Sequence, residues 1–326
     1  MTKLSKKAVN IFIYMFLVPL CFWLCYTLQH PQISVVMAVY NSEKYLDEMI
    51  QGVLNQSFTD FEFIIVNDAS TDNSLAIINK YAQRDKRIQV YSNEKNSGAA
   101  ATRNEGLKHV RGKYTLVIDS DDVLLPEALK KSYMRAEQDN LDVFIFQAFQ
   151  YYEEERIMRQ LYQVNSRYIR TQRLWIFPPE RIMGSLFQFT MLYGWNKFIR
   201  TDLLKKNNIW FQKHRYYDDS YFTVMALLKA KRIGYTWENL YLYRYERKGS
   251  QTDRISNNEK LHGKIAVATS LREEFKKMKL PDGIYISMFF WLRERYNRNV
   301  DEENYLLAEQ FIEETELKYM HANYFR

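Results

Sequence analysis

The sequence predicts an α/β fold in which a mainly parallel sheet is flanked by helices, with an N-terminal transmembrane helix and a C-terminal helical extension. Three observations lead to this prediction. Apolar stretches of strand length alternate with stretches of helical periodicity between residues 33 and 121. Residues 8–28 carry no charge, and the chain from about residue 257 reads as helices rich in Lys, Arg and Glu.

The uncharged N-terminal segment, AVNIFIYMFLVPLCFWLCYTL, is long enough to cross a membrane. As a helix it would measure about 30 Å, the thickness of the hydrocarbon core. Three lysines precede it, and no small-residue cleavage site follows it, which argues against the alternative of a cleaved signal peptide. We therefore expect residues 1–30 to anchor the protein in a membrane.

The body of the chain begins as alternating strands and helices. Strands are predicted at 33–40, 61–68, 88–93 and 114–121, where short apolar runs are rich in β-branched and aromatic residues. Helices are predicted at 42–56, 70–84 and 99–110, where apolar residues recur at helical spacing or the segment begins with polar residues that can cap a helix. The short connections imply a mainly parallel sheet with helices on both faces. After the stretch 141–154 the pattern becomes irregular.

Three carboxylates follow the fourth predicted strand in the motif LVIDSDD: Asp119, Asp121 and Asp122. Ligands of an open α/β sheet bind beyond the carboxyl ends of its strands. Acids packed this closely repel each other unless a cation lies among them, and oxygen ligands suit Mg or Mn. The alternative is an acidic turn that caps a helix beginning near Pro126.

Polar residues also follow the other strands. Asp68, after the second strand, is placed to accept hydrogen bonds from a base or ribose, or alternatively to cap an Asx turn. Arg103, in the helix after the third strand, would meet a phosphate or the neighbouring acids, or would lie on the helix surface. The GxGxxG fingerprint is absent from the sequence, which argues against a dehydrogenase.

The chain of 326 residues is basic, with a formal charge of +7 and a pI of about 9.0. This charge favours anionic partners such as nucleotide phosphates or anionic lipids. Nucleic acid is not an expected partner, because the basic residues are scattered among acids. Both cysteines, Cys21 and Cys25, lie in the uncharged segment, so the body of the protein has no disulfide and no Cys-based zinc site.

Three consecutive motifs carry a specific resemblance: ISVVMAVYNSEKYLDEMIQGVLNQSFTDFEFIIVNDASTDNS, NSGAAATRNEG and LVIDSDD. Together they resemble the start of a family 2 glycosyltransferase with the GT-A fold, over roughly residues 32–125. A weaker similarity continues to about Thr252 through WNKFIRTDLLKKNNIWF, YYDDSYF and LYLYRYERKGSQT. The resemblance implies a transferase domain at 31–255, with a nucleotide-sugar half at 31–125 and an acceptor half at 126–255. Residues 256–326 would form the helical extension.

The resemblance also implies an activity. A sugar would be transferred with inversion from a nucleotide-diphospho-sugar, usually a UDP-sugar, to an acceptor hydroxyl, with Mn or Mg as cofactor. A cell-envelope glycan or glycolipid is the acceptor expected for an anchored enzyme. Because UDP-sugars are made in the cytosol, we expect the catalytic domain on the cytoplasmic face of a bacterial inner membrane. The lysines before the uncharged segment favour the opposite orientation.

The resemblance assigns roles to individual residues. Asp119 and Asp121 would be the DXD pair, with Asp121 as the direct metal ligand. The remaining contacts to the nucleotide-sugar would come from the strand ends and the acidic turn, through Ala38, Tyr40, Asp68, Arg103, Asp119, Ser120 and Asp122. Ala38 stands where the family commonly has proline, and Ala69 where it commonly has glycine, so fine geometry is expected to differ.

The transfer also needs a base, because the acceptor hydroxyl loses a proton as it attacks. Asp218 and Asp219 in YYDDSYF resemble the family's acidic motif, with Asp219 as the base and Asp218 in support. The alternative is a helix N-terminus, where acids are common. Trp195 and Asn196 would form the acceptor floor, since aromatic faces pack against sugar rings; a core tryptophan is the alternative.

Two other functions were weighed against this prediction. A sugar-nucleotide nucleotidyltransferase would need a Gly- and Lys-rich phosphate loop near the N-terminus, and AVYNSEKY is not one. A non-catalytic, membrane-anchored saccharide-binding scaffold would not need the acids of the expected site, and all of them are present.

Overall fold

The computed structural model describes residues 30–161, 164, 176–212, 216–245, 256–293 and 310–311. The uncharged segment at 8–28, predicted to be a membrane anchor, lies outside these residues. In the described part of the chain, no helix combines the length and the apolar character that crossing a bilayer requires.

The N-terminal half has the predicted alternation of strands and helices. Its strands are parallel neighbours in the order β3-β2-β1-β4: β1 (Ile33–Val39), β2 (Phe61–Asn67), β3 (Ile88–Ser92) and β4 (Tyr114–Asp119). The connecting helices are α3 (Glu43–Leu54), α4 (Ser74–Ala82) and α5 (Ala99–Lys108). Each helix returns the chain to the same end of the sheet, so the four strands end at one edge.

The second half extends the same sheet and places an antiparallel strand between two strands that run in the same direction. β9 (Lys197–Arg200) lies antiparallel between β4 and β6 (Val143–Tyr152), and β10 (Ile233–Tyr245) runs parallel to β6. Three short strands complete the pairing: β5 (Val123–Leu124) and β8 (Ile176–Phe177) on β10, and β7 (Ile157–Leu161) on β6. The sheet is therefore mixed: β3, β2, β1 and β4 pair in parallel throughout, whereas the second half combines the parallel pair β6 and β10 with antiparallel strands.

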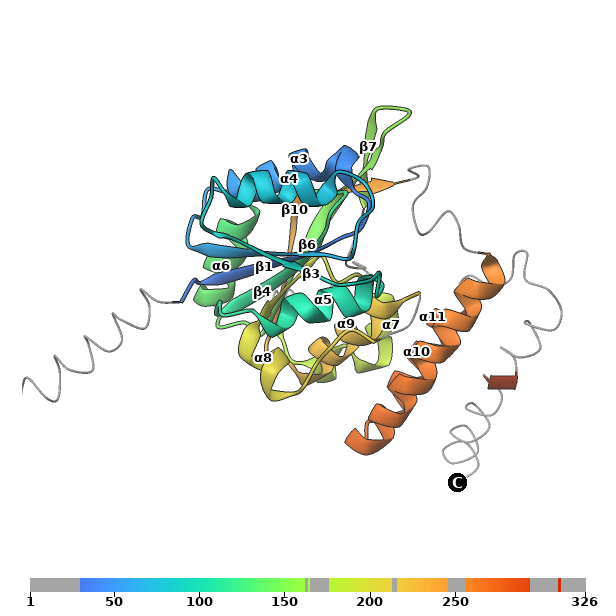
Figure 1. Ribbon diagram of the computed structural model, residues 1–326. Helices are drawn as coiled ribbons and strands as arrows, with labels where there is room; N and C mark the ends of the chain where they lie inside the picture. The colour runs from blue at the N-terminus through green and yellow to red at the C-terminus, as the bar shows by residue number, and fades with distance from the viewer. Residues whose placement is uncertain are drawn as a thin grey trace, which may run out of the picture.

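Helices cover both faces of the sheet (Figure 1). Alternate residues of β1 face opposite cores: Val35 and Met37 pack with α3, whereas Val36 packs with α5. The face of α3 and α4 also receives α6 (Ala128–Gln138). The opposite face carries the short α7 (Leu186–Phe189) and α8 (Thr201–Lys206), with α9 (Asp218–Lys229) beside them. Burial on both faces explains why the parallel strands are apolar runs without alternation.

A glycine allows α5 to lie close to the sheet. A Cβ atom at Gly106 would stand 2.5 Å from Cγ1 of Val36, closer than two carbon atoms can approach. The absence of a side chain there brings the helix against β1 and β2. This close packing matters for function, because the same helix carries Arg103.

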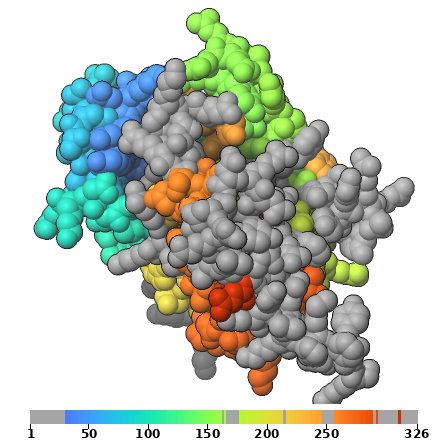
Figure 2. All heavy atoms as spheres, turned by 90° about the vertical axis from the view of Figure 1, so that its right-hand side faces the viewer, coloured from blue at the N-terminus to red at the C-terminus, as the bar shows by residue number. Residues whose placement is uncertain are grey.

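The C-terminal helices are part of the fold. α10 (Asn257–Met278) lies where the sequence predicts a helix and begins with a capping box between Ser256 and Glu259. It packs on α9 and on α11 (Asp282–Arg293), and α11 packs on α7 and on the 3-10 turn η4 (Met183–Ser185). Figure 2 shows α10 in orange at the molecular surface, below the blue N-terminal half. The predicted extension thus contributes to the core that holds α9.

Candidate active site

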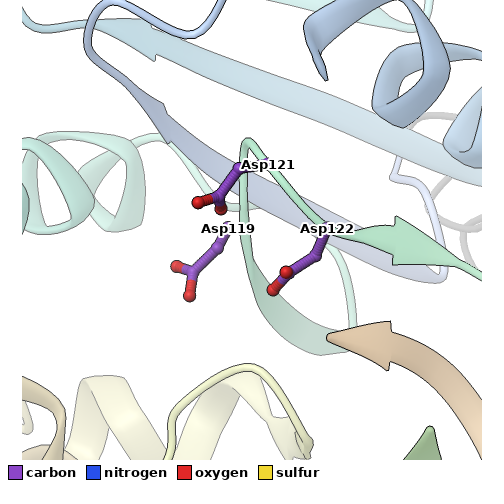
Figure 3. Close-up of side chains that lie close together, drawn as sticks. All are labelled: Asp119, Asp121 and Asp122. Carbon is purple, nitrogen blue, oxygen red and sulfur yellow. The ribbon is translucent and has the colours of Figure 1, made fainter. Parts of the chain in front are cut away.

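The three acids of the LVIDSDD motif lie together at the end of β4. Asp119 is the last residue of that strand, and Asp121 and Asp122 occupy the turn before β5. One oxygen from each carboxylate can be chosen so that all three lie within 4.8 Å of one another. Figure 3 shows Asp119 and Asp121 on the same side of the turn, with Asp122 extending toward them. The prediction that these acids form a cluster at the sheet edge is confirmed.

Asp122 is buried at this edge, with only 1% of its surface exposed. Its Oδ1 accepts a hydrogen bond of 2.8 Å from the backbone N–H of Arg244 on β10. Burial and the neighbouring charge of Asp119 raise the pKa of Asp122 well above its usual value. A divalent cation that ligates the acids directly would offset both the burial of the carboxylates and their mutual repulsion. The donor set of three carboxylates fits Mn or Mg, both of which prefer oxygen ligands.

Arg103 connects the acid cluster to a second pair of acids. Its Nη2 lies 2.7 Å from Oδ1 of Asp119, and its Nη1 lies 2.6 Å from Oδ2 of Asp218. The side chain is 14% exposed. Burial alone would lower the pKa of Arg103, but the charges of Asp218 and Asp119 raise it, so the guanidinium stays charged. Arg103 is therefore an ion-pair bridge, and the alternative of a plain surface arginine is wrong.

Asp218 and Asp219 form the first turn of α9, next to a left-handed residue. Tyr217, at the helix N-cap, has a φ of 59°, a conformation that non-glycine residues rarely adopt. Oδ2 of Asp219 accepts a hydrogen bond of 3.2 Å from the backbone N–H of Gly194. Burial, followed by the charge of Asp218, raises the pKa of Asp219 to about 7, although Arg103 opposes the shift. A carboxyl group with this pKa can accept a proton at neutral pH.

Asp68 uses both of its oxygens within the protein. Oδ1 accepts hydrogen bonds from the Asn93 side chain at 2.7 Å and from the Ser97 N–H at 2.9 Å, and Oδ2 accepts one from the Gly98 N–H at 2.9 Å. Gly98 has a φ of 84°, the left-handed region that glycine favours. Asp68 thus holds the distant turn between β3 and α5 in place, which differs from the local Asx turn given as the alternative.

Ser120 is also engaged inside the protein. Its hydroxyl lies 2.7 Å from the hydroxyl of Ser42, just before α3, and the residue is buried. This contact ties the acidic turn to the loop that follows β1. Ala38 pairs with Asp119 across β1 and β4 and is half-buried, whereas Tyr40 at the strand end is 47% exposed. Of these residues, Tyr40 and Ala38 have surface that a nucleotide could contact.

Trp195 and Asn196 lie below the surface, contrary to their expected place on an acceptor floor. Trp195 is 3% exposed and stacks against Tyr241, with ring centroids 4.6 Å apart. Asn196 is 0% exposed, and its side chain donates to the carbonyl of Phe146 at 3.2 Å. The sheet buries both residues because they lead directly into β9, so Trp195 is a core tryptophan.

Two tyrosines lie on the outer side of this stack: Tyr243, which the sequence suggests as part of a segment closing over the diphosphate, and Tyr193, which sequence reasoning did not place at the site. Tyr193 and Tyr243 are half-buried, and their rings stack with centroids 6.0 Å apart. Both rings also stack on Trp195, at 5.2 and 5.6 Å. Burial, then Tyr193 and the charges of Asp122 and Asp119, raise the pKa of Tyr243, so this ring borders the acid cluster. Tyr243 belongs to the motif LYLYRYERKGSQT, whereas no local motif marks Tyr193, because the stack joins distant segments.

The chain is similar to proteins that are named as glycosyltransferases. The Glycosyl transferase family 2 model matches residues 34–207. The cholesterol galactosyltransferase of Borreliella burgdorferi is 31% identical over 234 residues, which are 69% of this chain and 63% of the relative. The poly(ribitol-phosphate) beta-glucosyltransferase of Bacillus spizizenii is 32% identical over 260 residues, 76% of this chain and 39% of the relative. The chain therefore spans less than two thirds of the length of these relatives.

A solved structure shares the fold. The crystal structure of residues 1–349 of S. aureus TarS superposes with a TM-score of 0.66 at 24% identity, covering 87% of this chain and 80% of that chain. The same protein in complex with UDP-GlcNAc gives a TM-score of 0.60. The structural match and the sheet order show a GT-A-like fold, and the family model and the curated relatives show that this chain belongs to glycosyltransferase family 2.

Proposed function

We propose that the protein is a metal-dependent, inverting glycosyltransferase that moves a sugar from a UDP-sugar to a hydroxyl group of a cell-envelope glycan or glycolipid. The observation that carries this proposal is the bridge made by Arg103 between Asp119 and Asp218. An inverting transfer needs a cation site for the diphosphate and a base near the reacting sugar carbon. The bridge joins Asp119, in the candidate cation site, to Asp218, the neighbour of the candidate base Asp219.

Asp121, Asp119 and Asp122 would hold the divalent cation. When bound there, the cation would neutralise charge on the departing diphosphate. Arg103 adds a fixed positive charge at the same edge, since its ion pairs keep it protonated. Tyr40 and Ala38 offer surface for the base of the nucleotide, and Asp68 supports this region by fixing the turn before α5.

Asp219 would act as the base. Its pKa of about 7 leaves a substantial fraction of the carboxylate ready to take the proton of the acceptor hydroxyl at neutral pH. The N–H of Gly194 holds one carboxylate oxygen and so limits rotation of the side chain. Asp218 would support the site indirectly, because its carboxylate is engaged with Arg103.

Tyr193 and Tyr243 are our revised candidates for the sugar-contacting surface, in place of Trp195 and Asn196. Both rings are half-buried; Tyr243 precedes Arg244, whose N–H binds Asp122, and Tyr193 stacks on Tyr243. Aromatic faces pack well against the C–H faces of sugars. Trp195 would support them from below through its own stacking contacts.

The names of two relatives support the proposed acceptor class. One is named for cholesterol, a lipid alcohol, and the other for poly(ribitol-phosphate), a polyol polymer. Attachment to a membrane through residues 8–28, with the catalytic domain on the cytoplasmic face, remains a prediction from the sequence alone. It is compatible with acceptors carried by a lipid.

The test is UDP or GDP release by the full-length protein in detergent. The donors are UDP-glucose, UDP-galactose, UDP-N-acetylglucosamine and, as a nucleotide control, GDP-mannose, each with Mn, Mg or a chelator. We expect release from one UDP-sugar with metal, and its loss in Asp121→Ala. Binding of UDP-sugar without release from any donor would contradict the proposal and favour a scaffold. Equal release with a chelator would contradict the metal role.

A further inference from the structure

A lysine lies buried beside the proposed base. Lys197, the first residue of β9, is 1% exposed. Its Nζ donates to the carbonyl of Met191 at 2.8 Å, to the carbonyl of Tyr193 at 3.1 Å and to Oδ1 of Asn196 at 2.5 Å. An ammonium group has three protons and no lone pair, so three acceptors match its charged form. A neutral amine would leave its lone pair facing one of these oxygens.

The segment held by Lys197 is the one that contacts Asp219. Gly194 donates its N–H to Oδ2 of Asp219, and its carbonyl accepts the N–H of Lys197 at 3.2 Å. The Tyr193 carbonyl, already bound by Lys197, also accepts the hydroxyl of Thr223, one turn further along α9, at 3.3 Å. Lys197 therefore fixes residues 191–194 from one side while α9 contacts them from the other.

The electrostatics connect the same two residues. Burial lowers the pKa of Lys197 to about 7, and the charge of Asp219 opposes this shift. Since this coupling is reciprocal, a charged Lys197 favours the ionised form of Asp219. The other charged groups that act on Asp219 are Asp218 on its own helix, Arg103 on α5 and Asp119 on β4. Of these groups, Arg103 is already engaged by two carboxylates.

We propose that Lys197 is a positioning residue for the transfer reaction, which orients the Gly194 N–H toward Asp219 and keeps that carboxyl group ionised. The proposal rests on the proposed function, in which Asp219 is the base. The role of Lys197 depends on the fold, because the loop before β9 must bend back to bring its carbonyl groups to Nζ, and Asp219, whose charge acts on Lys197, comes from α9.

The experiment measures kcat and KM for the donor from pH 5 to 9 in wild type and in two variants without the positive charge. Lys197→Met removes the charge and the hydrogen bonds, whereas Lys197→Gln removes the charge and keeps a donor. Loss of the charge makes Asp219 harder to ionise, so the acid limb of the kcat profile should move to higher pH by about one unit. We expect kcat at pH 7 to fall about tenfold or more, with KM changed less than threefold.

Thr223→Val is the matched control. It removes a hydrogen bond to the same carbonyl of Tyr193 without removing a charge, so its acid limb should stay at the wild-type position. Thermal melts establish that each variant is folded, and Lys197→Gln serves if Lys197→Met does not fold.

An unshifted acid limb in a folded variant without the charge would overturn the proposal, even if kcat falls. Failure of the proposed function is a separate result, since the wild type itself would then neither bind a UDP-sugar nor release UDP.

Discussion

Replacing Asp219 with asparagine should stabilise the protein while it abolishes transfer. Asparagine has the same shape and still offers an oxygen to the N–H of Gly194, but it cannot ionise. In the folded protein the pKa of Asp219 is about 7, whereas in the unfolded chain it is about 3.9. Ionisation is thus easier in the unfolded chain, and at neutral pH the carboxylate favours unfolding.

The sign and size of the change in unfolding free energy follow from the linkage between ionisation and folding. Below about pH 4 the carboxyl is protonated in both states, so the variant gains nothing. Between about pH 4 and pH 7 only the unfolded state ionises, so the advantage of the variant grows, and above about pH 7.5 it is constant. Roughly three pH units between the two pKa values correspond to about 4 kcal/mol. Partial exposure and solvent screening reduce this to about 2 kcal/mol.

The assay is urea denaturation of wild type and Asp219→Asn at several pH values between 4 and 8.5, without metal or donor. We expect the free energy of unfolding to rise by about 2 kcal/mol at pH 8 and to be unchanged near pH 4. Asp202→Asn is the control, because Asp202 is exposed and forms a surface ion pair with Lys206; its effect should stay below about 0.5 kcal/mol. A variant that is no more stable than wild type at pH 8 would refute the reasoning.

Two further perturbations test the ion pairs. Arg103→Met leaves Asp119 and Asp218 without their shared cation, so it should cost about 3–5 kcal/mol of unfolding free energy at pH 7 and should eliminate UDP release. Recovery of part of that stability on acidification, seen in melts at pH 5, is expected; a variant as stable as wild type would contradict the bridge. Glu62→Gln should cost about 1–3 kcal/mol, because buried Glu62 accepts from Ser34 and pairs with Arg111. Its pKa is lowered, so the loss should shrink as pH falls below about 4, and a pH-independent loss in urea titrations would contradict its ionised state.

The parallel half of the fold was predictable because each element is encoded locally. The apolar runs that became β1, β2 and β4 need only their own composition to be recognised, and the acids after β4 follow from where that strand ends. The mixed half was not predictable in the same way. β9 is only a short strand whose antiparallel place depends on β4 and β6, which lie far away in the sequence.

The residues of the candidate site also differ in how far the local sequence predicts their positions. Asp119, Asp121 and Asp122 are sequence neighbours, so their clustering could be predicted, as could the two acids that begin α9. Long-range packing decided the rest. Trp195 is a residue type that commonly packs against sugars, yet stacking on Tyr241 from β10 buries it.

The type of a residue also does not show whether its polar groups already form hydrogen bonds within the protein. Asp68 is an acid at a strand end, as a ribose contact would be, but three donors from the next turn occupy its oxygens. Lys197 reads as an ordinary basic residue at the start of a strand. Its burial, and the carbonyl groups that surround its Nζ, exist only in the folded chain.

The anomeric configuration of the product tests most directly whether Asp219 directs a single displacement. The donor identified by UDP release, in its α form, is incubated with wild-type protein and metal without an acceptor, so that water takes the sugar and UDP leaves. The free sugar is followed by proton NMR before it mutarotates. We predict β product, and none above background with Asp219→Asn. An α product, or an Asp219→Asn variant that transfers at the wild-type rate, would contradict the assignment of Asp219 as the base.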